Sequence, residues 1–75
     1  MNKSEEKLRQ DIRSIRHNLG ITQKEMGAKM GMTESAYNRI EGGMIAMSYS
    51  HLLAISEAFG ISVADIILYP DKYNM

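Results

Sequence analysis

Apolar residues recur along the chain at the three- and four-residue spacing that places side chains on one face of a helix. No stretch shows the strict alternation of apolar and polar residues that is typical of strands, and no hairpin turn signal competes. The pattern predicts an all-α bundle with helices over Glu5–Leu19, Gln23–Met30, Glu34–Glu41, Tyr49–Phe59 and Val63–Leu68. Their apolar faces supply the expected core, which consists of Leu8, Ile12, Ile15, Leu19, Met26, Met30, Ala36, Tyr37, Ile40, Leu52, Ile55, Phe59, Val63, Ile66 and Ile67, with Tyr49 at its edge.

Three junctions between the predicted helices repeat one short pattern, which reads LGIT, MGMT and FGIS. In each, a glycine able to adopt the left-handed conformation ends one helix, and a Thr or Ser two residues later caps the next. The spacing of Thr22 and Glu25 predicts a capping box, and Ser62 and Asp65 predict a weaker version of one. These signals support the predicted helix boundaries.

Only Gly31 to Thr33 separate the second and third predicted helices. A connection this short forces two helices to cross steeply, which is the arrangement of a helix-turn-helix unit. Gly27 favours the same interpretation. Glycine inside a helix costs about 1 kcal/mol relative to alanine, and a small residue at this position lets the following helix approach closely.

Composition excludes several classes of protein. A chain of 75 residues has the length of one domain, with a core over about residues 5–69 and a tail over 70–75. Without cysteine there are no disulfides and no thiolate metal sites, and His17 and His51 lack metal-ligand spacing, so we expect no metal and no cofactor. No catalytic constellation has supporting spacing, so we do not expect an enzyme. We see no signal peptide and no membrane-spanning apolar run.

The charge distribution bears on nucleic-acid binding. Formal net charge is zero, which argues mildly against a nucleic-acid binder. However, the segment from Lys7 to Met44 has seven basic and four acidic residues, and both ends of the chain are acidic. This mildly basic centre is compatible with DNA binding, and an ordinary solvated surface is the alternative interpretation.

The segment ITQKEMGAKMGMTESAYNRIEGG resembles the helix-turn-helix of phage repressors and Cro proteins, a family of bacterial transcriptional regulators that includes xenobiotic-response-element-like proteins. The resemblance covers about residues 8–67. Its specific elements are Thr22-Gln23, Gly31, Ile40-Glu41-Gly42-Gly43 and Phe59-Gly60-Ile61-Ser62. It implies a five-helix lambda-repressor-like DNA-binding domain in a cytoplasmic, nucleoid-associated protein of bacterial or phage origin. It also implies that the third helix lies in the DNA major groove.

The third predicted helix has a polar outward face that suits base recognition. Since Ala36, Tyr37 and Ile40 point inward, Ser35 and Asn38 point outward, with Glu34 and Arg39 beside them. Arginine can donate two hydrogen bonds to guanine, asparagine can pair with adenine, glutamate can accept from cytosine, and serine can serve a base or a phosphate. We expect base contacts from Glu34, Ser35, Asn38 and Arg39, and a face that is only solvated is the alternative.

The family resemblance also implies backbone contacts and an internal ion pair. The resemblance implies a phosphate contact for Gln23, with an ordinary exposed residue at the start of the second helix as the alternative. From their positions we also expect phosphate contacts from Thr33, Arg13 and the backbone N–H groups around Gly43, with Arg9 as a further candidate at the rim. For Arg9 and Arg13 a solvated surface is the alternative. For Gln23 the resemblance implies a brace on the recognition helix as well. Arg16 and Glu41 match family positions that pair across the first and third helices, so we expect a structural ion pair between them.

The segment GGMIAM, after the third predicted helix, departs from the family pattern. Family members usually carry basic or polar residues there, whereas this chain has Met44, Ile45 and Met47. There are two interpretations of these apolar side chains. Either they fold back on the core of the same domain, or they form a homodimer interface together with Ile67, Leu68 or Tyr69. A dimer would bind near-palindromic double-stranded DNA. The alternative function is an antitoxin-like interaction module, in which the apolar loop or the C-terminal tail binds a partner protein.

Overall fold

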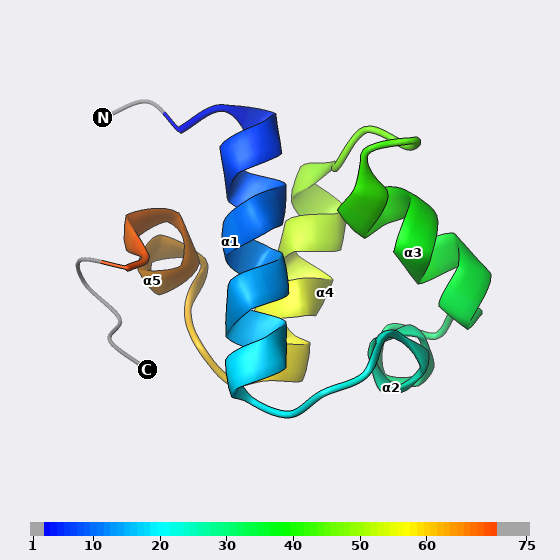
Figure 1. Cartoon of the computed structure of the whole chain (residues 1–75). Helices are drawn as coiled ribbons and strands as arrows, with labels where there is room; N and C mark the ends of the chain where they lie inside the picture. Colours follow the sequence, from blue (N-terminus) through cyan, green and yellow to red (C-terminus); the bar gives the residue numbers. More distant parts are fainter. Residues whose placement is uncertain (1–2, 71–75) are drawn as a thin grey trace.

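The computed structural model describes residues 3–70, and this part of the chain forms five helices and no strand (Figure 1). The helices are α1 (Glu5–Asn18), α2 (Gln23–Lys29), α3 (Glu34–Gly42), α4 (Tyr49–Phe59) and α5 (Val63–Leu68). The predicted all-α fold is confirmed, and no helix end differs from its predicted position by more than one residue. The predicted tail lies outside the described residues except for Pro70.

Side-chain caps and left-handed glycines define the helix ends, as the repeated junction predicts. Thr22, Thr33 and Ser62 each accept a hydrogen bond from a backbone N–H in the first turn of the helix they precede. The glycines of the three junctions, Gly20, Gly31 and Gly60, have φ angles of 72°, 72° and 74°. Turns with positive φ favour glycine, because other residues meet a steric penalty there.

The capping boxes are only partly as predicted. Thr22 and Glu25 form the complete box, whereas Ser62 makes its half alone and Asp65 does not return the bond. A box that was not expected joins Ser48 to His51, whose Nδ1 accepts from the backbone N–H of Ser48 at 3.2 Å. An imidazole nitrogen here takes the place of the usual carboxylate or amide oxygen.

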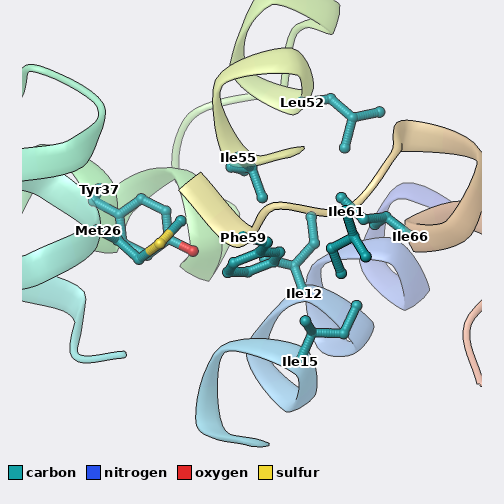
Figure 2. Packing of buried hydrophobic residues seen from close by; sticks show 9 residues of the cluster. All are labelled: Ile12, Ile15, Met26, Tyr37, Leu52, Ile55, Phe59, Ile61 and Ile66. Carbon is teal, nitrogen blue, oxygen red and sulfur yellow. The ribbon is translucent and has the colours of Figure 1, made fainter. Parts of the chain in front are cut away.

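Helix α1 stands beside α4 in the middle of the molecule, with α5 on one side and the α2–α3 pair on the other (Figure 1). The core lies between these groups and draws residues from all five helices and the turn before α5 (Figure 2). Its buried members are Ile12, Ile15, Met26, Tyr37, Leu52, Ile55, Phe59, Ile61 and Ile66. Ile40 is buried as well, so α3 is held by its inward face.

Of the expected core positions, Leu19 lies at the surface, and Leu8, Met30, Ala36 and Val63 are half-buried. Leu19, the C-cap residue of α1, is 38% exposed. Ile67 is only half-buried. Tyr49, expected at the edge of the core, is 68% exposed.

Gly27 lies where α2 meets the turn to α3, and the predicted close approach is confirmed. A Cβ atom at this position would lie 2.9 Å from the carbonyl oxygens of Met32 and Thr33. The same approach allows the Met32 N–H to donate to the Gly27 carbonyl at 2.8 Å. The steep crossing of α2 and α3, visible in Figure 1, therefore depends on a residue with no side chain.

A buried charge cluster joins the beginning of the chain to α5. Asp11 is 3% exposed and accepts hydrogen bonds from Lys3 and Lys7. Lys3 Nζ also donates to the carbonyl oxygens of Ile66 and Tyr69 at 3.4 and 3.0 Å. Because these carbonyls lie at the end of α5, one lysine both neutralises Asp11 and caps that helix.

Candidate nucleic-acid interface

The outward face of α3 presents the four predicted base contacts together. Glu34, Ser35, Asn38 and Arg39 are all exposed. On the opposite face Tyr37 is completely buried and Ile40 is 2% exposed. The Thr33 hydroxyl, a predicted phosphate contact, accepts from the Ala36 N–H at 3.0 Å and so fixes the start of the helix. The outward face of α3 is therefore open to solvent, while the opposite face of the helix is buried in the core and its first turn is capped by Thr33.

Glu41 is the centre of a buried hydrogen-bond network behind this face. Its carboxylate accepts from Arg16 Nε at 2.8 Å and from Arg16 Nη2 at 3.0 Å, so the expected ion pair is present and bidentate. Tyr37 donates its hydroxyl to the same carboxylate at 2.6 Å, and Arg13 Nε lies 3.4 Å away. Because Arg16 also donates to the Ile21 carbonyl at 2.9 Å, the network connects α1, α3 and the turn into α2.

The network shifts the ionisation of its members. Burial alone would raise the pKa of Glu41, but the hydrogen bonds from Arg16, Tyr37 and Gln23 outweigh burial and lower it below its ordinary value. Desolvation and the neighbouring carboxylate raise the pKa of Tyr37, so its hydroxyl keeps its proton. The pair of Arg16 and Glu41 is therefore charged at neutral pH, with Tyr37 as a neutral donor.

Lowering the pH should destabilise the protein, because protonation of Glu41 removes the charge that Arg16 binds. A carboxyl with a lowered pKa in the folded state stabilises the protein above its unfolded pKa, near 4.5, and this contribution is lost as pH falls through the folded pKa. We expect the free energy of unfolding, measured by urea denaturation between pH 7 and pH 3, to fall less steeply in Glu41→Gln than in the unchanged protein. Equal slopes would assign the acid sensitivity to other carboxyls, such as Glu25, whose pKa is lowered by hydrogen bonds from Thr22.

Gln23 lies between this network and the outward face of α3. Its Nε2 donates to Glu41 Oε1 at 3.0 Å, while its Oε1 accepts from Asn38 Nδ2 at 3.0 Å. The expected brace on α3 is therefore present. Each polar atom of the Gln23 amide makes one of these bonds, and the second hydrogen of Nε2 is the donor that the expected phosphate contact would use.

Arg13, another predicted phosphate contact, projects from α1 beside the end of α3. Its side chain is 54% exposed. It borders a shallow cleft of about 160 Å³ that is also lined by Glu6, Arg9, Gln10, Glu41 and Gly42. Arg9 is less available, because Glu5 accepts from its Nη1 at 2.8 Å and only 18% of its side chain is exposed. Arg13 is therefore the more accessible of these two arginines.

Gly43 and the backbone after it do not offer free N–H groups, and this expectation was wrong. The N–H of Gly43 donates to the carbonyls of Arg39 and Ile40, and the N–H groups of Met44 and Ile45 donate to the Arg39 carbonyl. These bonds close the end of α3, where Gly43 has a φ of 89°. The Arg9 guanidinium lies against Gly43, so close that a Cβ there would be 2.8 Å from it.

The apolar loop is divided between the core and the surface. Met47 is half-buried, packs on the core and donates its N–H to Glu5 at 3.0 Å. Met44 and Ile45 instead remain 82% and 40% exposed.

The residues near the end of α5 that were expected to form a homodimer interface with this loop also differ in their exposure. On α5, Leu68 is 40% exposed and Ile67 is half-buried, whereas Tyr69, just after the helix, packs on the core. Figure 1 shows the α3–α4 loop and α5 on opposite sides of α1. The two sets therefore form separate surfaces on one copy of the chain.

A comparison with protein-family models agrees with this geometry. Residues 12–66, which run from the middle of α1 into α5, match a helix-turn-helix family of the Cro/C1 type. The chain belongs to this helix-turn-helix family. It is thus a DNA-binding regulator in general character, and α2 and α3 form its helix-turn-helix unit. No curated protein matches the chain, and no helix within residues 3–70 is both long and apolar enough to cross a membrane.

Two contacts that organise the helix-turn-helix surface have partners that were not identified from the sequence, although the resemblance implied that Gln23 braces the third helix. Tyr37 was assigned to the core without a partner for its hydroxyl, although a buried tyrosine needs one and Glu41 lies four residues further along the helix. The bond from Asn38 to Gln23 joins two residues on different helices. The helical pattern of α3 alone placed Asn38 outward, and nothing in the spacing pointed to Gln23.

Proposed function

We propose that this helix-turn-helix protein is a sequence-specific repressor, acting on bacterial or phage DNA as a homodimer with α3 in the major groove. The observation that carries the proposal is the outward face of α3, where Glu34, Ser35, Asn38 and Arg39 are exposed on a helix anchored from behind. Occupying a site that overlaps a promoter would be enough for repression.

Each side chain on this face has a base edge that it can recognise. Arg39 can donate two hydrogen bonds to O6 and N7 of guanine, and Glu34 can accept from N4 of cytosine. Ser35 is able to bind either a base or a phosphate. Arg13, beside the end of α3, and Thr33, at its start, are exposed and are proposed to hold the DNA backbone.

The scarcity of phosphate contacts favours a dimer. Backbone contacts supply most of the sequence-independent affinity for DNA, and the loop after α3 has no basic side chain. A two-fold dimer doubles the available contacts and places two recognition helices about 34 Å apart on a near-palindromic site. Met44 and Ile45 on the loop, or Ile67 and Leu68 on α5, offer apolar surface for its interface.

A second candidate function has one observation in its favour. Among residues 3–70, Met44 is the most exposed of the large apolar side chains, and only Gly43 separates it from α3. An antitoxin-like module would use this loop to bind a partner protein, with DNA binding weak or dependent on that partner. A stable heteromeric complex combined with no DNA binding at low salt would support this function over the first.

Selection of bound sequences from a random pool of double-stranded DNA tests the proposed function. We expect an enriched, near-palindromic site whose binding weakens as salt is raised. Arg39→Ala should relax the preference at one base position of each half-site, with a cost of about 1–3 kcal/mol for the preferred base.

The outcome of the same selection can also go against the proposal. If no sequence is enriched, α3 does not read bases. A uniform loss of affinity across all sequences in Arg39→Ala would make Arg39 a phosphate contact, and the base assignment would be wrong.

A further inference from the structure

The loop between α3 and α4, residues 43–48, lies in the longest part of the chain that has no aspartate, glutamate, lysine or arginine, which runs from Gly42 to Ser56. Met44 and Ile45 of this loop are exposed. Without a charged side chain, the loop cannot form an ion pair with the rest of the domain. The groups that hold it in place therefore come from its own backbone and from neighbouring helices.

Helix α1 supplies two such groups from its first two turns, which lie at the same end of the molecule as the loop (Figure 1). Glu5 Oε2 accepts a hydrogen bond from the Met47 N–H at 3.0 Å. The same oxygen accepts from Arg9 Nη1 at 2.8 Å. One carboxylate oxygen of α1 is therefore bound both to the end of the loop and to Arg9.

The Arg9 guanidinium covers the beginning of the loop. A Cβ on Gly43 would lie 2.8 Å from Cζ and Nη2 of Arg9 and 2.9 Å from its Nε. Because three atoms of this planar group are almost equally distant, the guanidinium turns its face toward the glycine. Glu5 and Arg9 therefore contact the loop near both of its ends, at Met47 and at Gly43.

Arg13, one turn further along α1, has a different environment. Its recorded hydrogen bond goes to Glu41, at 3.4 Å, and 54% of its side chain is exposed, against 18% for Arg9. A phosphate contact from Arg9 would have to compete with Glu5 and draw the guanidinium away from Gly43. Arg13 can bind a phosphate without such a change, so the two arginines suit different roles.

We propose that Glu5 and Arg9 form a clamp that positions the α3–α4 loop and holds Met44 and Ile45 in place for contact with a second copy of the chain. The inference rests on the proposed function, in which these two apolar side chains are candidates for the homodimer interface. A loop already held in its bound conformation loses less conformational entropy on association. Arg9 is then a positioning residue, in place of the phosphate contact expected at the rim.

NMR of the free protein tests the clamp itself. Arg9→Met keeps most of the aliphatic stem and removes the guanidinium. Backbone order parameters for residues 44–46 should fall from about 0.85 to below about 0.6, and the Met47 amide should exchange about three- to tenfold faster. Arg13→Met removes the same charge from the same helix and should leave both measurements unchanged.

A second pair of variants tests the carboxylate of the clamp. Glu5→Gln removes the negative charge that makes the hydrogen bonds from Met47 and Arg9 stronger than neutral ones, so the Met47 amide should again exchange faster. Glu6→Gln makes the same change at the neighbouring exposed position and serves as the control. Equal exchange of the Met47 amide in the two variants would show that Glu5 does not hold the loop.

DNA with one or two half-sites of the selected sequence tests the role in dimerisation. Arg9→Met should reduce the cooperativity between two half-sites by about three- to tenfold, and should not change the salt dependence of binding to one half-site. Arg13→Met should do the opposite. Its cooperativity should be unchanged, and the slope of log affinity against log salt should become smaller by about one.

The possible failures are distinguishable. An equally ordered loop in Arg9→Met would overturn the clamp whatever the DNA result. A mobile loop with unchanged cooperativity would place Met44 and Ile45 outside the dimer interface, and a smaller salt slope in Arg9→Met would make Arg9 a phosphate contact; either result refutes the positioning role. If the unchanged protein enriches no sequence, or fills two half-sites independently, the proposed function is wrong and the role in dimerisation is wrong with it.

Discussion

Replacing Glu41 with glutamine should lower the free energy of unfolding by about 3–5 kcal/mol, because it leaves the buried charge of Arg16 without its counterion. The Glu41 side chain has no exposed area, and that of Arg16 is 8% exposed. Glutamine has nearly the same shape but cannot accept from Arg16, Tyr37 and Gln23 in the same way. A domain of this size has a total stability on the order of 5–10 kcal/mol, so urea denaturation should show the change clearly.

Two comparisons make this prediction specific. Glu34→Gln removes an exposed carboxylate from the same helix and should change stability by less than about 0.5 kcal/mol. The losses of stability in Arg16→Ala, Glu41→Ala and the double variant, measured by thermal melting, should be strongly coupled. Each single change leaves the other buried charge without its counterion. Additive effects in this cycle would mean that the ion pair is not a brace between α1 and α3.

Gly27→Ala should destabilise the protein by about 1–3 kcal/mol even though alanine is the better helix former. The added Cβ would meet the backbone of Met32 and Thr33 at 2.9 Å, and backbone atoms cannot move aside as a flexible side chain can. Relief of the clash requires α3 to move away from α2. We therefore expect a lower melting temperature together with weaker DNA binding.

Gly42→Ala provides the matched control for Gly27→Ala. Gly42 is also helical, at the end of α3, but a Cβ there meets nothing within 4 Å. Alanine at this position should leave stability unchanged or raise it by up to about 1 kcal/mol. If Gly27→Ala were as stable as Gly42→Ala, the close approach of α2 to the turn would not limit the fold.

Local signals account for the accuracy of the sequence-based fold. Helical periodicity depends on residues three and four apart, and the caps depend on a glycine and a hydroxyl two residues apart, so both can be read from short segments. The same signals placed Glu34, Ser35, Asn38 and Arg39 on one face of α3. Gly27 could be interpreted because a glycine inside a helix carries a cost that needs a reason.

The contacts that the sequence did not reveal join residues far apart in the chain. No structural role was assigned from the sequence to Asp11, whose buried carboxylate accepts from Lys3, and Lys3 in turn donates to a carbonyl at the end of α5. The loop after α3 followed neither expectation alone, since Met47 packs inward while Met44 stays exposed. These outcomes are set by tertiary geometry, to which periodicity and capping signals do not respond.

The contacts of Lys3 with Ile66 and Tyr69 can form only after the segment that contains α5 has been synthesised. The carbonyls of Ile66 and Tyr69 emerge from the ribosome 63 and 66 residues after Lys3. Helix α5 has only six residues, well below the length at which an isolated helix is stable in water. A nascent chain therefore has α1 to α4 available before α5, and the contacts of Lys3 with the end of α5 form after these four helices have been synthesised.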